Sequence, residues 1–183
     1  MRQVWTGAVV AAAVLSLTAC GGQGDAPASE TQETAASVRP GTDVNGARIS
    51  AARSTPEDWL TYGGTYDEQR HSSLTGITRE NIGELGVTWT YDLATNRGVE
   101  STPIVVDGTM YVTSAWSIVY ALDAKTGEEK WVYDPDADRA AGANACCDVV
   151  NRGVAVYDGK IFVGVIDGTL DACLLYTSDA ADE

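Results

Sequence analysis

Short runs of alternating apolar and polar residues, separated by Asp-Gly pairs, dominate the middle of the chain. Two of them are TPIVVDGTMYVTSA, from Thr102, and GVAVYDGKIFVGVIDGTL, from Gly153. Asp-Gly between alternating runs is a strong hairpin signal, because a type I′ turn needs positive φ at both central residues. The pattern therefore predicts an all-β fold with hairpin turns at residues 107–108, 158–159 and 167–168.

One helix is expected, in ITRENIGELG at residues 77–86. Thr78 would cap the beginning of this helix, and Gly86 would end it. No other stretch is predicted to be helical.

The two strand-rich runs are copies of each other without a gap. Asp107 superposes on Asp158 and Ala121 on Ala172, with 51 residues between the members of each pair. A repeat of about this length, made of four short strands, is typical of a β-propeller blade, which needs stacked neighbours to bury both its faces. Residues 58–172 are predicted to hold about two such blades.

The first 20 residues have the pattern of an export signal, with Arg2 followed by an apolar run. The sequence LTAC before and at Cys20 resembles the bacterial lipobox, whose cysteine becomes acylated. Residues 1–20 are therefore interpreted as a lipoprotein signal peptide, and Cys20 as a membrane anchor. The alternative is an ordinary secretory signal. Either reading takes the mature chain to the periplasm, where disulfides persist.

Two further segments do not have the pattern of a folded core. Residues 21–57 are rich in Gly, Ala, Ser, Thr and Glu without apolar periodicity, which favours a flexible tether. After Ala172 the repeat breaks off into CLLYTSDAADE, which resembles a translated sequencing adaptor. Residues 173–183 are therefore interpreted as a non-native tail on a truncated propeller, the alternative being a genuine tail with a free Cys173.

The net charge of the chain limits the kinds of molecule that it can bind. The 183 residues carry a formal net charge of -14 with a pI near 4.3. Such a surface repels phosphates, so no nucleic-acid partner is expected. The acidic residues are scattered, which is typical of a solvated surface.

Two adjacent cysteines, Cys146 and Cys147, stand in the stretch NACCDVVNRGV. Neighbouring Cα atoms are about 3.8 Å apart, below the usual span of about 4.4 to 6.8 Å for bridged cysteines. A disulfide between them would distort the backbone, and its rigid, flat ring would suit a planar aromatic ligand. Free or intermolecular thiols are the alternative. A metal site is disfavoured, because His71 is the only histidine and no Cys-x-x-Cys occurs.

Arg152 and Glu100 are further candidates for a binding site. The guanidinium of Arg152 is a planar fork that matches carboxylates. A surface or interblade salt bridge would also explain Arg152, and an exposed strand edge would also explain Glu100.

Four stretches together resemble a known family, the quinoprotein alcohol dehydrogenases that use pyrroloquinoline quinone (PQQ). They are WLTYGGTYDEQRHSSLTGI, GVESTPIVVDGTMYV, YALDAKTGEEKW and ACCDVVNRGVAV, and the resemblance covers residues 58–172. A tryptophan-docking motif of these propellers, which indicates only the fold, matches Ala121, Asp123, Thr126, Gly127 and Trp131. The cysteine pair with Asn-Arg-Gly downstream is the more specific match.

The resemblance implies an eight-bladed propeller with PQQ near its axis, beside Ca²⁺ or a lanthanide. Cys146 and Cys147 would form a vicinal disulfide stacked on PQQ, Arg152 would bind a cofactor carboxylate, and Glu100 would hydrogen-bond at the cofactor rim. The catalytic Asp and the metal ligands are expected beyond this fragment, as is any haem c domain. The fragment itself is expected to be inactive and poorly folded.

The function predicted from this resemblance is oxidation of alcohols to aldehydes, with electrons passed to a cytochrome. One alternative is a non-catalytic propeller lipoprotein that helps to assemble the outer membrane. Another is a PQQ-dependent sugar or polyol dehydrogenase. The cysteine pair, Arg152 and Glu100 favour the alcohol dehydrogenase.

Overall fold

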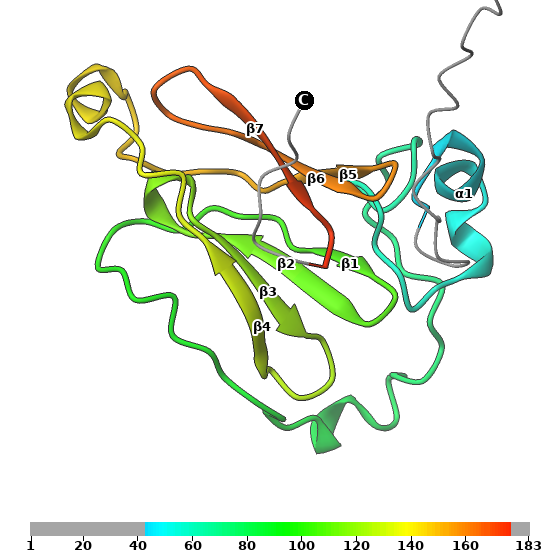
Figure 1. Ribbon diagram of the computed structural model, residues 1–183. Coiled ribbons are helices and arrows are strands. Elements are labelled where there is room, and N and C mark those ends of the chain that lie inside the picture. The colour runs from blue at the N-terminus through cyan, green and yellow to red at the C-terminus, as the bar shows by residue number, and fades with distance from the viewer. Residues whose placement is uncertain (1–42, 177–183) are drawn as a thin grey trace, which may run out of the picture. The chain divides into compact units, whose positions relative to one another are not determined.

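The computed structural model describes residues 43–176 (Figure 1). The expected signal peptide with Cys20, residues 21–42 of the tether and residues 177–183 of the tail lie outside this range. Within it, no helix is both long enough and apolar enough to span a bilayer.

In the described part of the chain, seven short strands form two antiparallel sheets, each in the order of the chain. The first sheet contains β1 (Ile104–Val106), β2 (Thr109–Thr113), β3 (Val119–Asp123) and β4 (Glu129–Tyr133). The second contains β5 (Ala155–Tyr157), β6 (Lys160–Gly164) and β7 (Leu170–Leu174). Ile104 and Ala155 begin β1 and β5, and they are 51 residues apart. The repeat is thus confirmed for three strands of each copy, since β2 and β3 are followed at the same interval by β6 and β7.

Two of the three expected hairpin turns have the predicted backbone. Asp107 and Asp158 both have φ of 48°, and the glycine after each also has positive φ. The third turn differs, because only Gly168 has positive φ there. The carboxylate of Asp167 accepts hydrogen bonds from the backbone and hydroxyl of Thr169, which closes a wider loop. The prediction of a type I′ turn is wrong at this position.

The helix expected at residues 77–86 is reduced to one 3₁₀ turn, η2 (Ile82–Glu84). Ile77, Ile82 and Leu85 are 60%, 52% and 63% exposed. A segment this short gains helical stability mainly from packing, and this one buries no apolar side chain. The cap-like residues therefore did not suffice, and the prediction of a helix here is wrong.

The structure also contains helical turns that the sequence pattern did not predict. They are α1 (Gly46–Ser50), η1 (Ala52–Ser54), η3 (Ala115–Ser117) and η4 (Arg139–Asn144). The first two lie in the stretch expected to be a tether, and Val44, Ile49 and Ala52 are buried there. Residues 43–57 therefore differ from the expectation of a flexible tether, because these three apolar side chains pack in the core.

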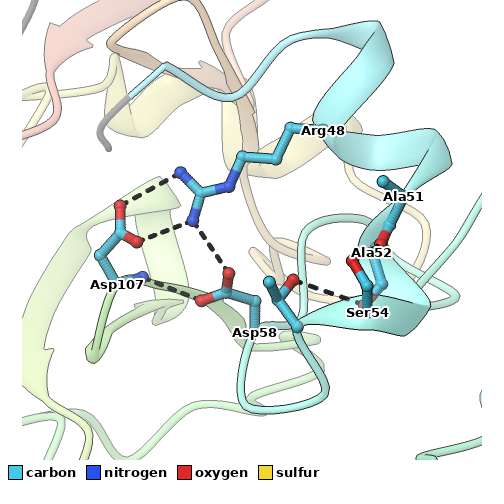
Figure 2. Close-up of polar contacts among 7 residues, drawn as sticks. Arg48, Ala51, Ala52, Ser54, Asp58 and Asp107 are labelled. Carbon is cyan, nitrogen blue, oxygen red and sulfur yellow. Dashed lines mark hydrogen bonds and ion pairs between the residues drawn. The ribbon is translucent and has the colours of Figure 1, made fainter. Parts of the chain in front are cut away.

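An ion-pair network joins α1 to the first sheet (Figure 2). Arg48 donates to both oxygens of Asp107 and to Asp58, with its Nη2 2.7 Å from Asp107 Oδ1 and 2.9 Å from Asp58 Oδ2. Asp58 in turn accepts the backbone N–H of Asp107 at 3.0 Å. The hydrogen bond to Asp107, followed by that to Asp58, raises the pKa of Arg48, although burial opposes the shift. The network fixes α1 beside the β1–β2 turn.

The two sheets share one hydrophobic core. Ile104, Val106 and Tyr111 of the first sheet belong to the same buried cluster as Ile161 and Val163 of the second. This shared core is the stacking that a propeller blade requires.

Aromatic residues extend this core. Tyr111 donates a buried hydrogen bond of 2.9 Å to the carbonyl of Leu175, beyond the end of β7. Trp131 packs against the core, with its ring centroid 5.9 Å from that of Tyr111. Trp131, in β4, therefore packs on the core beside Tyr111 of its own sheet.

The turn within the docking motif is closed by a second tryptophan. Trp89 lies over Gly127, where a Cβ atom would come within 2.5 Å of the indole ring. Its Nε1 donates to the carbonyl of Ala124 at 3.3 Å. The carboxylate of Asp123 accepts the backbone N–H groups of Thr126 and Lys125, which lower the pKa of Asp123. Trp89 is thus a packing residue.

Candidate functional site

Two irregular segments lie side by side at the candidate site. One comprises residues 97–102, before β1, and the other comprises residues 145–153, before β5. The N–H of Thr102 donates to the carbonyl of Arg152 at 3.0 Å. Gly153 has φ of 122°, and a Cβ there would meet the Thr102 carbonyl oxygen at 2.8 Å. Glycine at this position therefore permits the close approach of the two segments.

Arg152 and Glu100 are brought together by this approach. Nη2 of Arg152 lies 3.2 Å from Oε2 of Glu100, and the two side chains are 68% and 48% exposed. Such an exposed pair contributes little to stability. The guanidinium remains accessible to an anion from solvent.

The cysteine pair lies within electrostatic reach of this ion pair. Cys146 and Cys147 are exposed free thiols in this structure. The hydrogen-bond interaction with Cys146, in which the Cys147 thiol acts as donor, and then the charge of Cys146 raise the pKa of Cys147, while Arg152 lowers it and Glu100 raises it. The structure therefore brings all four predicted cofactor-site residues together. Their role in binding PQQ and the vicinal disulfide stay predictions.

Asn151 holds the second segment against both sheets. Its Nδ2 donates to Ser117 at 3.1 Å and to the carbonyl of Gly164 at 2.8 Å. Its Oδ1 accepts the N–H of Gly153 at 2.9 Å. The sequence pattern gave Asn151 no role, although its place in Asn-Arg-Gly marked it as part of the motif.

A second ion pair crosses between the segments. Nη1 of Arg97 lies 2.6 Å from Oδ1 of Asp148, the residue after Cys147. The backbone N–H of Val149, then the charge of Arg97 and the N–H of Gly98, lower the pKa of Asp148 against the effect of burial. The sequence offered no signal for this pair, because two exposed charges on separate loops have no diagnostic spacing.

Tyr62 and Arg70 line a hollow of about 450 Å³ that also includes Thr102. The guanidinium carbon of Arg70 lies 4.1 Å from the centre of the Tyr62 ring. Hydrogen bonds with Arg70 and Thr102 lower the pKa of Tyr62, and the charge of Arg152 acts in the same direction. This mixed apolar and cationic surface therefore adjoins the candidate site.

Other sequence candidates lie elsewhere. His71 is exposed and lines a separate small hollow with Trp59. Trp116 lies under Arg139, whose guanidinium carbon is 4.4 Å from the ring centre. Among residues 43–176, no group of three or more His, Cys, Asp or Glu side chains could hold a metal ion.

Comparison with known proteins connects this arrangement to one family. The profile described as "PQQ: Glucose/ethanol/alcohol dehydrogenase, beta-propeller domain" matches residues 59–181. The quinohemoprotein alcohol dehydrogenase ADH-IIG of Pseudomonas putida is 57% identical over 130 residues, which are 71% of this chain and 18% of that protein. The 1-butanol dehydrogenase (cytochrome c) of Thauera butanivorans is 58% identical over 117 residues, or 63% of this chain and 17% of that protein.

Solved structures agree with these matches. A structure of ADHIIG from Pseudomonas putida HK5 superposes with a TM-score of 0.76 at 53% identity, covering 79% of this chain and 21% of that one. A europium-containing methanol dehydrogenase gives a TM-score of 0.69 at 38% identity, covering 73% of this chain and 24% of that one. The chain thus spans about a fifth of the length of the relatives it matches. The predicted all-β propeller fold is confirmed.

Proposed function

Because the chain belongs to the family of PQQ-dependent glucose/ethanol/alcohol dehydrogenase propellers, we propose that it is the N-terminal part of an enzyme that oxidises alcohols to aldehydes. In this proposal electrons pass to a cytochrome, as the name of the Thauera relative suggests. Activity is proposed for the full-length protein, and this chain alone is expected to be inactive.

One observation supports the proposal above all others. Cys146, Cys147, Glu100 and Arg152 come from two segments far apart in the sequence, yet they form one exposed cluster. A scaffold propeller has no evident need for such a set, because none of these exposed side chains contributes to the buried core. The cluster therefore favours a cofactor site over the scaffold alternative.

The chemistry of the cluster fits PQQ, a planar aromatic molecule with carboxylate groups. Arg152 would bind a carboxylate through its planar fork, and its present contact of 3.2 Å with the carboxylate of Glu100 supports this role. The adjacent sulfurs would offer a polarisable surface to the ring, as a disulfide or as thiols. Glu100 would keep the guanidinium oriented and hydrogen-bond at the cofactor rim.

When bound, PQQ supplies a quinone that accepts hydride from the alcohol, beside a metal ion that acts as a Lewis acid. The residues of this chain would bind and orient the cofactor. We propose that Ca²⁺ or a lanthanide is that metal, and that the metal ligands and the catalytic Asp lie in the part of the relatives that this chain does not span. A haem c domain is proposed on the same basis, from the quinohemoprotein relatives.

The proposed location is the periplasm. An acylated Cys20 would hold the protein at the membrane, and residues after it would separate the propeller from the bilayer. Mass spectrometry of the exported protein would detect the acyl chains on this cysteine.

Titration of the full-length apoprotein with PQQ and Ca²⁺ tests the proposal. We expect quinone absorbance to become protein-bound. Arg152→Gln should weaken the affinity at least tenfold, because it removes a charge-assisted, bidentate contact worth about 1.5–3 kcal/mol. The thermal unfolding temperature should change little, since the pair with Glu100 is exposed. Arg53→Gln, at an exposed ion pair with Asp67, is the matched control. If the wild-type protein does not bind PQQ, the proposal is wrong.

A further inference from the structure

Arg97 and Asp148 form an ion pair that has no part in the proposed cofactor contacts. Nη1 of Arg97 and Oδ1 of Asp148 are 2.6 Å apart, and the two side chains are 51% and 33% exposed. Asp148 directly follows Cys147 in the chain. The pair therefore acts on the backbone that carries the cysteines.

Asp148 has a backbone conformation that requires support. Its φ is 67°, in the left-handed region that residues other than glycine rarely adopt. Its carboxylate accepts a hydrogen bond of 2.6 Å from Nη1 of Arg97. Because Arg97 belongs to the segment that carries Glu100, Asp148 joins the two halves of the site.

The neighbouring contacts show what this junction holds in place. Cys146 and Cys147 are exposed thiols directly before Asp148 in the chain. The N–H of Trp116 donates to the carbonyl of Val149 at 2.9 Å, which fixes the chain just after Asp148. Asp148 therefore links the exposed cysteine pair to a part of the chain that is fixed by hydrogen bonds.

We infer that Arg97 is a positioning residue for the cysteine pair: by holding Asp148 in its left-handed conformation, it keeps the two sulfurs together beside Glu100 and Arg152. The part of this inference that concerns cofactor binding rests on the proposed function. Arg97 acts through Asp148, because Nη1 of its guanidinium donates to that carboxylate.

The first test needs no cofactor. The full-length apoprotein is equilibrated in mixtures of reduced and oxidised glutathione, and the Cys146–Cys147 disulfide is measured by alkylation and mass spectrometry. Closing the disulfide transfers two electrons and two protons from the two thiols to one oxidised glutathione, which becomes two reduced glutathiones.

Arg97→Gln should lower the equilibrium constant for closing about three- to fivefold, the effect of losing one exposed ion pair. Arg97→Lys should restore part of it. Arg53→Gln, at the exposed pair with Asp67, should have no effect. An unchanged constant in Arg97→Gln would overturn the inference.

The second test uses PQQ affinity in the presence of Ca²⁺ and two backgrounds. Arg97→Gln should weaken binding about three- to fivefold in the wild-type background. Asn tolerates left-handed φ but carries no charge, so Asp148→Asn removes the ion pair while sparing the backbone. In that background Arg97→Gln should have almost no further effect.

An equal loss of affinity in both backgrounds would overturn the inference, because it would show that Arg97 attracts the anionic cofactor directly. Failure of the wild-type protein to bind PQQ would instead contradict the proposed function. In that case the glutathione measurement still decides whether Arg97 positions the cysteines.

Discussion

The two sheets agree in their strands and differ in the segments that precede and connect them. Tyr111 of β2 and Phe162 of β6 occupy equivalent positions of the repeat, as do Asp107 and Asp158 of the first turns. The connections within the two sheets differ, however. Trp116 and Ser117, between β2 and β3, both have positive φ, whereas of the equivalent residues between β6 and β7, Asp167 and Gly168, only the glycine does. The strands thus provide a common core, and the irregular segments provide the individual chemistry.

The segments that break the repeat also carry the candidate site. Glu100 precedes β1, whereas the cysteine pair and Arg152 precede β5. These segments are held by side-chain hydrogen bonds and ion pairs rather than by a strand ladder. Substitutions in the strands should therefore change stability, and substitutions in the segments should change binding, unless they alter the approach of the two segments.

Several substitutions test this division between strands and segments. The largest effect is expected for a substitution of Gly153. Gly153→Ala places a Cβ 2.8 Å from the carbonyl oxygen of Thr102, at a φ of 122° that alanine avoids. We expect the free energy of unfolding to fall by about 3 kcal/mol, measured by chemical denaturation of the full-length apoprotein.

Gly159→Ala in the β5–β6 turn is the control for this change. Gly159 has φ of 73° but no atom close to the added Cβ. Gly159→Ala should lower the free energy of unfolding by about 1 kcal/mol, because backbone strain alone opposes this substitution. Equal costs at the two glycines would show that the close approach of the segments adds nothing.

A smaller effect is expected within the strands, at Tyr111. Tyr111→Phe makes β2 more like β6, where the equivalent residue is Phe162. It removes the buried bond to the carbonyl of Leu175, so stability should fall by about 1–2 kcal/mol while the affinity for PQQ is preserved. Tyr157→Phe, at a tyrosine that is 49% exposed, is the control and should change stability little. A loss of PQQ affinity without a loss of stability would contradict the division between strands and segments.

The smallest effect is a pH dependence that the two regions share. The pKa of Asp123 in the docking motif and that of Asp148 beside the cysteines are both lowered in the folded protein. A lowered pKa means that each carboxylate stabilises the fold above its unfolded pKa of about 4, and that this contribution is lost as the pH falls through the folded value.

Thermal unfolding between about pH 6 and pH 3 measures this contribution. In Asp123→Asn and in Asp148→Asn, the unfolding temperature should fall less steeply with decreasing pH than it does in the wild-type protein. Only Asp148→Asn should also change the equilibrium of the cysteine pair. If neither substitution alters this pH dependence, other carboxylates cause most of the loss of stability at low pH.

The repeated part of the fold could be predicted from the sequence because its signals are local. Alternation along β2 and β6 and the Asp-Gly pairs at 107–108 and 158–159 do not depend on distant residues. The helix expected at 77–86 failed for the converse reason, since local capping signals were present but no surface was available for packing. At α1, tertiary docking of Val44 and Ile49 stabilises a helix that composition alone argued against.

The candidate site divides in the same way. Glu100, Cys146, Cys147 and Arg152 could be selected because they lie in distinctive motifs, and the structure brings them together. Arg97 and Asp148 could not, because an ion pair between two loops depends on how the loops approach each other. Nothing in the sequence distinguished Gly153 from a glycine in a turn, although this glycine permits the close approach of the two segments.

The hydrogen bond from Tyr111 ends on a main-chain oxygen, and this has a consequence for the interpretation of residues 173–183. A carbonyl group is supplied by every amino acid, so the contact places no demand on which side chain follows β7. Among residues 173–176, the buried positions are Cys173 and Leu175, and both are met by small or aliphatic side chains. A foreign peptide of suitable polarity could therefore complete the edge of this blade as readily as an inherited one.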